Sequence, residues 1–261
     1  MRIVTVANEK GGVGKTTVAV NLAAALGLAG SRVLLIDLDS QGHATQWLGI
    51  PKGKVDPERS AYGVLARKTT VSKTMVQSAE QGVTLSAAHV LLAHVAAELN
   101  VSVDGVLVLR EALRTELPLD YVVIDCPGAK GAVVFNALIA ADVVLAPVRA
   151  EVLSLEGLTE LTATVEKVRE RFSPQLPPPR ILLNDYDGRS GADRAIYEHV
   201  RHEYGARVFD VVLSRDAPLR ECFGAQQSIF RYRPSARSAA YFRDLASEVM
   251  EVRSVAQNAT V

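Results

Sequence analysis

The segment Lys10-Gly11-Gly12-Val13-Gly14-Lys15-Thr16-Thr17 combines glycines, lysines and threonines in an order that suits phosphate binding. Glycines let the backbone curl so that successive amide N–H groups point inward, and the N-terminus of a following helix adds partial positive charge. At this spacing Lys15 would reach the β- and γ-phosphates of a nucleotide, and the Thr16 hydroxyl would ligate Mg²⁺. A tight turn alone gives no reason for Gly-Lys-Thr-Thr. The sequence therefore predicts a nucleotide site with contacts from Gly11, Gly12, Val13, Gly14, Lys15, Thr16 and Thr17.

Two acidic segments elsewhere in the chain supply carboxylates for such a site. Val122-Val123-Ile124-Asp125 is an apolar strand pattern that ends in an acid, the arrangement that holds Mg²⁺-bound water beside a nucleotide. Asp37 and Asp39 follow the apolar run 33–36, and α/β folds place ligands at the carboxyl ends of parallel strands. Asp125 as a helix cap is the competing interpretation. We expect Asp125 to belong to the metal site.

The elements that must position these residues alternate between strands and helices. Short apolar runs, mostly continuous, predict buried strands at 3–6, 33–36, 83–85, 121–124, 143–145, 181–183 and 208–212. Helix-length segments lie at 15–29, 88–99, 103–117, 131–140, 153–172, 191–204 and 236–252. Segment 49–82 is polar and weakly periodic, which indicates loop and short helix. The repeated order of strand and helix predicts a doubly wound α/β fold, with a mainly parallel sheet and helices on both faces.

Composition limits the fold and its surroundings. The chain has 261 residues, 48% hydrophobic and 22% charged, which favours one ordered domain over 1–261. Because 29 Lys and Arg balance 29 Asp and Glu, attraction to nucleic acid or membrane requires a local patch. Two cysteines without ligand spacing exclude a disulfide framework. The chain shows no signal-peptide pattern and no run of about 18 apolar residues, so we expect a cytoplasmic protein without a membrane span.

The phosphate loop departs from its ordinary form at one place. Glu9 stands where the usual pattern has glycine, and Lys10 follows it directly. This form resembles the deviant Walker A ATPases of the ParA/Soj/MinD superfamily, which are P-loop NTPases that use ATP and Mg²⁺. The resemblance implies that the chain forms a homodimer around two ATP molecules, in which Lys10 reaches the phosphates bound by the partner subunit.

The acidic segment after the second predicted strand carries the same resemblance. Asp37-Leu38-Asp39-Ser40-Gln41-Gly42 is similar to the superfamily's D-x-D-P-Q-G box, with Ser40 in place of proline. By that resemblance Asp39 orients the attacking water and Asp37 supports the Mg²⁺ shell. The catalytic set implied for ATP hydrolysis is therefore Lys10, Lys15 and Asp39, and the metal set is Thr16, Asp37 and Asp125.

Later segments resemble the ParA/Soj branch, which partitions chromosomes and plasmids. Residues 147–151 are similar to its P-x-x-x-E stretch and residues 155–158 to its L-E-G-L stretch. Two loops resemble its nucleotide-base loops, which implies that Asn184 and Pro218 flank adenine; Asn184 as a plain turn residue is an equal alternative. Segment 248–261 has one basic and no aromatic residue, against the membrane-binding MinD branch. The branch implies a ParB-like partner that stimulates slow hydrolysis while plasmid, chromosome or another large cargo is positioned.

A local basic segment predicts DNA binding, which is also the superfamily's usual second activity. Residues 215–243 contain six arginines and two acids, a net charge of +4 in a neutral chain. The candidate phosphate contacts are Arg189, Arg215, Arg220, Arg231, Arg233, Arg237 and Arg243. No helix-turn-helix segment precedes the phosphate loop, so we expect binding to any DNA sequence through phosphates and association with the nucleoid. A solvated arginine-rich face is the competing interpretation.

Other functions compete with this interpretation. An ATP-dependent metabolic enzyme on the same fold, similar to dethiobiotin synthetase, would couple ATP turnover to a small molecule and ignore DNA. An iron–sulfur reductase would need thiolates at a dimer axis, and the chain lacks a convincing pair. His199 and His202 are three apart in a predicted helix without a third ligand, which favours a surface pair over a metal site. Trp47 is expected to pack beside the Asp39 loop, with stacking on a ligand as the competing interpretation.

Overall fold

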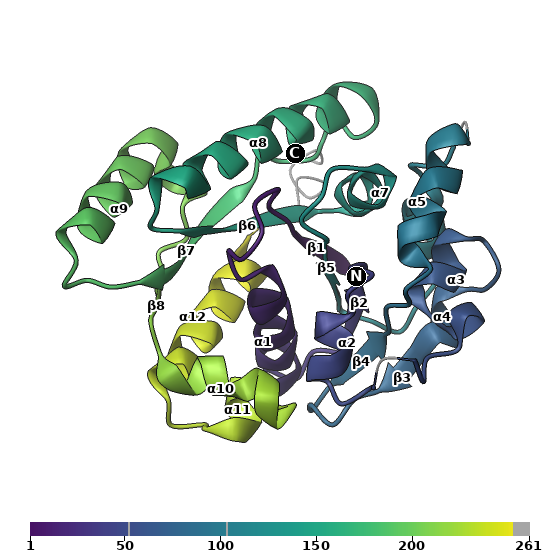
Figure 1. The fold of residues 1–261 in the computed structure, drawn as a ribbon, viewed down its shortest axis with the longest axis horizontal. Coiled ribbons are helices and arrows are strands. Elements are labelled where there is room, and N and C mark those ends of the chain that lie inside the picture. Colours follow the sequence, from purple (N-terminus) through teal and green to yellow (C-terminus); the bar gives the residue numbers. More distant parts are fainter. Residues whose placement is uncertain (52, 103, 253–261) are drawn as a thin grey trace, which may run out of the picture.

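A computed structural model describes residues 1–51, 53–102 and 104–252. Within these residues, eight strands form one sheet in the order β3-β4-β2-β5-β1-β6-β7-β8 (Figure 1). The strands are β1 (Arg2–Val6), β2 (Val33–Asp37), β3 (Met75–Gln77), β4 (Val83–Ser86), β5 (Tyr121–Asp125), β6 (Val143–Arg149), β7 (Arg180–Tyr186) and β8 (Leu213–Ser214). Strand β3 runs antiparallel to β4, and the other neighbouring pairs are parallel. The mainly parallel sheet predicted from the sequence is confirmed.

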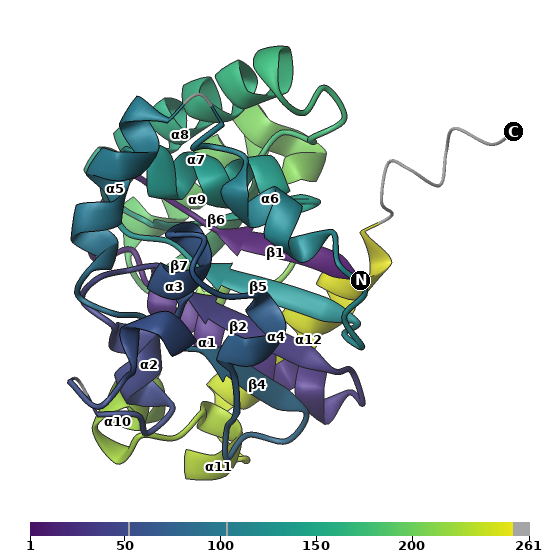
Figure 2. The same ribbon diagram turned by 90° about the vertical axis from the view of Figure 1, so that its right-hand side faces the viewer.

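Helices pack on both faces of the sheet, as the sequence predicts. One core contains residues from α3 (Ala61–Leu65), α4 (Val71–Thr74), α5 (Leu92–Val101), α6 (Val108–Leu113), α7 (Ala132–Ala140), α8 (Val152–Arg171) and α9 (Gly191–Tyr204). The other contains residues from α1 (Lys15–Leu28), α2 (His43–Trp47), α10 (Ala217–Ala225), α11 (Ile229–Tyr232) and α12 (Arg237–Glu251). Figure 2 shows the two layers from the side.

The apolar patterns of α1 and α12 explain where these helices lie. Helix α1 is apolar almost all round, and most of it is buried between the sheet and α12. Helix α12 buries a single stripe made of Ala239, Phe242, Leu245, Ala246 and Val249. This spacing of three and four residues puts one face of α12 against α1. The nucleotide-site helix α1 is therefore held from two sides.

Most predicted helices agree with the structure, and the disagreements are local. Helices α7, α8, α9 and α12 begin and end within one residue of the predicted bounds. The segment predicted as helix 103–117 contains only α6 over Val108–Leu113, and residue 103 lies outside the described residues. Segment 49–82 contains the expected short helices, including the 3₁₀ helix η1 (Pro57–Arg59), but also strand β3, which the sequence prediction missed.

The strand predicted at 208–212 is wrong. Only Val208 in this segment makes a bridge to β7, and the strand that follows is β8 at Leu213–Ser214. The carboxylate of Glu248 on α12 accepts hydrogen bonds from the backbone N–H groups of Asp210 and Val211, at 2.9 and 2.8 Å. The backbone N–H groups that would form hydrogen bonds to a neighbouring strand therefore donate to the Glu248 side chain instead. Among the described residues, no helix combines the length and apolarity needed to cross a membrane.

A buried amide joins α6 and α7. Asn136 is fully buried, and its Nδ2 donates to the carbonyls of Gly105 and Ala132 at 2.7 and 2.9 Å. Its Oδ1 accepts from the backbone N–H of Leu109 at 2.9 Å. The Asn136 side chain thus forms hydrogen bonds with backbone groups of two segments, and Gly105 in the first segment is 31 residues away in the sequence.

Replacing this amide tests its contribution to folding. Asn136→Ala is expected to lower the free energy of unfolding by about 3 kcal/mol, because buried backbone groups lose their partners. Urea denaturation measures the change, and Asn100→Ala, at an exposed position on α5, is the control expected to change little. A loss below about 1 kcal/mol for Asn136→Ala would contradict a role for these hydrogen bonds in stability.

Candidate nucleotide site

The phosphate loop connects β1 to α1 and depends on left-handed glycines. Gly12 and Gly14 have φ values of 76° and 94°, and Gly14 is the residue from which α1 begins. A Cβ atom at Gly14 would lie 2.2 Å from Nδ2 of Asn184. That Nδ2 donates to the carbonyl of Val13 at 2.8 Å, so the end of β7 packs directly against the loop. The structure therefore brings Asn184 to the predicted phosphate site.

The two lysines of the loop differ in surroundings. Lys15 is 8% exposed, and its Nζ donates to the carbonyl of Lys10 at 3.0 Å. Burial lowers the pKa of Lys15, while the charges of Asp125 and Asp39 act in the opposite direction. The Lys10 side chain is 28% exposed, with its Nζ 3.8 Å from Oε2 of Glu151. Lys15 is thus held inside the loop, whereas Lys10 lies at its edge.

Gly157 has a structural role that the L-E-G-L resemblance by itself does not explain. A Cβ atom at this position of α8 would lie 2.7 Å from Oδ1 of Asn8 and 3.0 Å from Cβ of Lys10. Asn8 supports the loop, because its Oδ1 accepts from the N–H of Lys10 at 2.9 Å and its Nδ2 donates to the carbonyl of Pro147 at 2.8 Å. Glycine in this stretch therefore lets α8 approach the phosphate loop. The side chain of Leu155 lies outside the described part.

Two carboxylates lie side by side at the ends of β2 and β5. Asp37 and Asp125 are partners in the strand register, and both are fully buried. Asp37 accepts hydrogen bonds from the N–H and hydroxyl of Thr45, at 2.8 and 2.7 Å, and from the N–H of Asp39 at 3.1 Å. Burial nevertheless raises the pKa of Asp37 to about 6. Burial, with the neighbouring charge of Asp37, raises the pKa of Asp125 well above its usual range.

Asp125 fits a bound cation. Neither of its carboxylate oxygens makes a well-formed hydrogen bond among the described residues, and only the Thr16 side chain comes near enough to act on its pKa as a hydrogen-bond donor. A buried carboxylate of this kind beside a phosphate loop is the donor expected for a Mg²⁺ ion or its water shell. No group of three or more His, Cys, Asp and Glu side chains in the described part of the chain forms a metal cage. Such an ion would therefore rely on Asp125, the Thr16 hydroxyl, nucleotide phosphates and water.

Asp39 lies in the turn that follows β2, where its charge acts on Lys15. Its Oδ1 accepts from the N–H of Gln41 at 2.9 Å, and its carbonyl accepts from the N–H of Gly42 at 2.8 Å. Gly42 has a φ of 64°, which closes the turn without proline at position 40. The Asp39 side chain is half-buried, in contrast to the fully buried Asp37. This difference suits a carboxylate that contacts water rather than one that supports a loop.

A pocket of about 650 Å³ opens beside the phosphate loop, which is within the range of about 300–1,000 Å³ for small-molecule sites. Its floor contains Gly12, Gly14, Thr16 and Thr17. Its walls contain His43, Trp47, Arg149, Asn184, Asp185, Ser214, Arg215, Asp216, Leu219, Arg220 and Phe223. Pro218, predicted to flank adenine, is buried, and its carbonyl accepts from the Sγ of Cys222 at 3.1 Å. The residues of α10 that line the pocket are its neighbours Leu219, Arg220 and Phe223.

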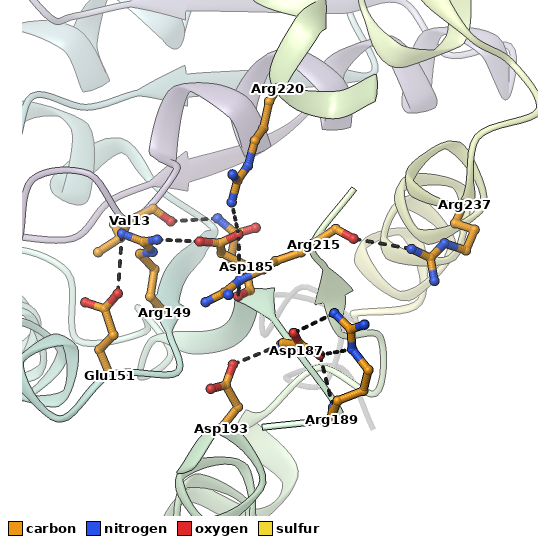
Figure 3. A network of polar contacts seen from close by, with 11 residues as sticks. Val13, Arg149, Glu151, Asp185, Asp187, Arg189, Asp193, Arg215, Arg220 and Arg237 are labelled. Atoms are coloured by element: carbon orange, nitrogen blue, oxygen red, sulfur yellow. Dashed lines mark hydrogen bonds and ion pairs between the residues drawn. The ribbon is translucent and has the colours of Figure 1, made fainter. Parts of the chain in front are cut away.

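Three arginines converge on Asp185 in one wall of the pocket (Figure 3). Arg149 pairs with its Oδ2, Arg220 donates to its Oδ1 at 3.0 Å, and Arg215 donates to its carbonyl at 3.1 Å. Burial acts to raise the pKa of Asp185, but the hydrogen bonds from Arg149 and Arg220 hold it below its usual value. Sequence reasoning missed the pair of Arg149 and Asp185, because 36 residues separate them.

The seven arginines predicted to bind DNA lie in different surroundings. Arg215 and Arg220 line the nucleotide pocket, and Arg189 pairs with Asp187 at 3.0 Å. The Nη1 of Arg231 lies 3.6 Å from Oε1 of the buried Glu80. The remaining three are Arg233 over the Tyr232 ring, Arg243 over the Phe230 ring and Arg237, which donates to the carbonyl of Arg215. His199 and His202 are both exposed.

Comparisons with known proteins agree with this geometry. A family profile described as an AAA domain matches residues 1–177, and one described as cellulose biosynthesis protein BcsQ matches residues 108–250. Chromosome partitioning protein ParA of Caulobacter vibrioides is 36% identical over 253 residues, covering 96% of this chain and 94% of the relative. Chromosome-partitioning ATPase Soj of Thermus thermophilus is 39% identical over 250 residues, covering 96% of each.

A solved structure extends the comparison to bound ligands. Cobyrinic acid a,c-diamide synthase from Mycobacterium smegmatis, with bound ADP and magnesium, superposes with a TM-score of 0.83 at 31% identity, covering 96% of this chain and 94% of that one. The parallel sheet, the glycine cradle with its two lysines and the buried carboxylates define a P-loop NTPase of the deviant Walker A kind. Within that class, the chain belongs to the ParA/Soj family.

Asp125 provides a test of the cation site. Asp125→Asn keeps the shape of the side chain but removes the carboxylate that a cation would bind. The change should abolish most of the thermal stabilisation that Mg·ATP gives the wild-type chain. Differential scanning calorimetry measures this effect, with Glu98→Gln, at an exposed position on α5, as the control. Equal stabilisation of Asp125→Asn and wild type by Mg·ATP would exclude Asp125 from the metal site.

Proposed function

We propose that the chain is an ATP-dependent dimerising ATPase that binds DNA without sequence preference and partitions or positions a large cargo. The observation that carries the proposal is the unequal placement of the two loop lysines. Lys15 is buried and faces the cradle of its own subunit, while Lys10 lies at the loop edge with its Nζ near the carboxylate of Glu151. A lysine so placed is available to a second phosphate group presented from outside, as the ParA/Soj resemblance implies.

Hydrolysis requires positioning and charge neutralisation more than covalent chemistry. The amides of 11–17 and Lys15 hold the phosphates, and bound Mg²⁺ supplies neutralisation of the charge that develops on them. Thr16 and Asp125 hold the ion or its water, and Asp37 keeps the Asp39 turn in place through the Asp39 N–H. Asp39 orients the attacking water. Asn184 holds the loop and lies beside the nucleotide pocket.

The proposed cycle resembles a switch. ATP joins two subunits, the dimer binds nucleoid DNA in the cytoplasm, and a ParB-like protein stimulates slow hydrolysis that separates them. Near full-length relatives named chromosome partitioning protein ParA and Soj support this assignment. The whole of 1–261 would act as one domain, with the cargo being plasmid, chromosome or another large structure.

Variants of the two lysines test the dimer. Lys10→Ala is expected to bind ATP as a monomer within a few-fold of wild type yet fail to dimerise, because its ammonium group would contact the partner's phosphates rather than its own. Lys15→Ala should bind ATP about 30-fold more weakly or worse, since the variant lacks a buried charge beside the phosphates. Isothermal titration calorimetry and light scattering with Mg·ATP measure the two properties.

A hydrolysis-blocked variant completes that test. Asp39→Ala should lower turnover about 100-fold or more while the ATP dimer persists, because only the water-orienting group is removed. If Asp39→Ala and wild type both stay monomeric with saturating Mg·ATP, the proposed dimer is wrong.

DNA binding is proposed from the basic segment 215–243 together with Arg189. Arg189 has a side chain that is 92% exposed, and Arg233 is exposed at the end of α11. Arginine is well suited to paired contacts with phosphate oxygens. Two copies of the segment in a dimer would double the number of contacts, which suits binding through phosphates alone.

Arg233→Ala tests this surface in the Asp39→Ala dimer. The affinity should fall alike for two duplexes of unrelated sequence, and the log–log salt slope should become shallower by about 0.9 for each phosphate that the variant no longer neutralises, or roughly twice that for a symmetric dimer. Fluorescence anisotropy across a salt series measures both quantities. Arg114→Ala, an exposed arginine outside the segment, is the matched control. Strong preference for one duplex, or no binding at low salt, would reject non-specific DNA binding.

An ATP-dependent metabolic enzyme is the second candidate. The observation in its favour is the 31% identity to a structure of cobyrinic acid a,c-diamide synthase over nearly the whole chain. This candidate requires ATP turnover that depends on a small-molecule acceptor and does not respond to DNA. Turnover by the purified chain without an acceptor, together with DNA binding by the Asp39→Ala dimer, would favour the partitioning function.

A further inference from the structure

Part of the lining of the nucleotide pocket is aromatic. Phe223 on α10 and Trp47 on α2 have ring centroids 5.5 Å apart and planes at 76°, and His43 meets Phe223 at 6.2 Å and 79°. All three residues line the pocket that begins at the phosphate loop. Trp47 is 4% exposed, whereas Phe223 is 39% exposed. Trp47 therefore supports the wall, and Phe223 presents its ring to the pocket.

The position of the Phe223 ring is fixed by contacts between α2 and the end of α10. The Nε1 of Trp47 donates to the carbonyl of Gln227 at 2.8 Å, and the Nε2 of Gln226 donates to the carbonyl of Gln46 at 3.1 Å. Both rings beside Phe223 meet it edge to face, so neither is stacked parallel to it. An exposed aromatic ring held in this way gains stability when a flat apolar group covers it.

The parts of the pocket differ in the chemistry that they match. The phosphate-loop part of the lining suits phosphate oxygens and contains Gly12, Gly14, Thr16 and Thr17. The arginine part suits anionic or hydrogen-bond-accepting groups and contains Arg149, Arg215 and Arg220. The Phe223 wall suits neither phosphate nor a metal ion. A nucleotide whose phosphates occupy the floor also has one flat ring system, and that is the group of the ligand that an aromatic surface recognises.

We propose that Phe223 is the nucleobase-stacking residue of the pocket, with Trp47 as the residue that positions it. The inference rests on the proposed nucleotide binding and adds to it the residue that distinguishes a nucleotide from a bare polyphosphate. Helix α10 lies near the start of the basic segment 215–243 and carries both Phe223 and Arg220, so the base would contact a helix of that segment. The purine ring would lie against α10 through Phe223 rather than through the buried Pro218.

Two ligands separate base recognition from phosphate recognition. Isothermal titration calorimetry is done with Mg·ATP and with Mg·tripolyphosphate, on wild type, Phe223→Ala and Phe223→Tyr. Phe223→Ala should bind ATP about 5- to 150-fold more weakly, the equivalent of one stacked base, while binding tripolyphosphate within about twofold of wild type. Phe223→Tyr keeps an aromatic face and should bind ATP within a few-fold of wild type.

The chain offers a control and an internal probe. Phe172 follows α8 and is 36% exposed, so Phe172→Ala removes a similarly exposed ring that does not line the pocket. Trp47 is the single tryptophan, so its emission reports on the wall and should change with ATP more than with tripolyphosphate. Unchanged ATP affinity in Phe223→Ala, or equal weakening for both ligands, would overturn the stacking role alone. Failure of wild type to bind ATP would overturn the proposed function and this inference together.

Discussion

Burial of negative charge at the ends of β2 and β5 is the constraint on which the nucleotide site depends. Asp37 and Asp125 are neighbours in register and have no exposed surface, so ionising both is costly without compensation. The fold compensates them differently. Asp37 receives well-formed hydrogen bonds from Thr45 and Asp39, whereas Asp125 has only the charge of Lys15 and the nearby Thr16 side chain. Asp125 is therefore the less compensated carboxylate and has more to gain from a bound cation.

The helix that begins at the phosphate loop also reaches the basic segment. Asn21 on α1 donates through Nδ2 to the carbonyl of Thr17 at 2.8 Å, and its Oδ1 accepts from the N–H of Ile229 at 2.8 Å. Buried Glu80 accepts from the N–H and hydroxyl of Ser228, at 2.9 and 2.7 Å, and faces Arg231. The start of α11 is thus bonded to α1 and to the turn before β4. A nucleotide that moves the loop would act on a helix already joined to the proposed DNA-binding surface.

Local sequence patterns predicted the parts of this fold that local physics determines. The phosphate loop, the acids after β2 and β5 and the bounds of α9 follow from glycine content, strand ends and helical period, and the structure has them. The strand expected at 208–212 does not form, because Glu248 takes the N–H groups of Asp210 and Val211 from 38 and 37 residues away. Periodicity carries no information about such a partner. Arg149 and Asp185 escaped prediction for the same reason, since their pairing depends on the register of β6 and β7.

A series of ion pairs connects the phosphate loop to α10. Ion pairs run from Lys10 to Glu151, from Glu151 to Arg149, and from Arg149 through Asp185 to Arg220. This chain of alternating charges crosses the carboxyl ends of β6 and β7 and ends on α10, beside the nucleotide pocket. In this chain of ion pairs, Glu151 and Asp185 neutralise the cations. A bound triphosphate would add negative charge to the same pocket and would compete with Asp185 for Arg149 and Arg220, which line it.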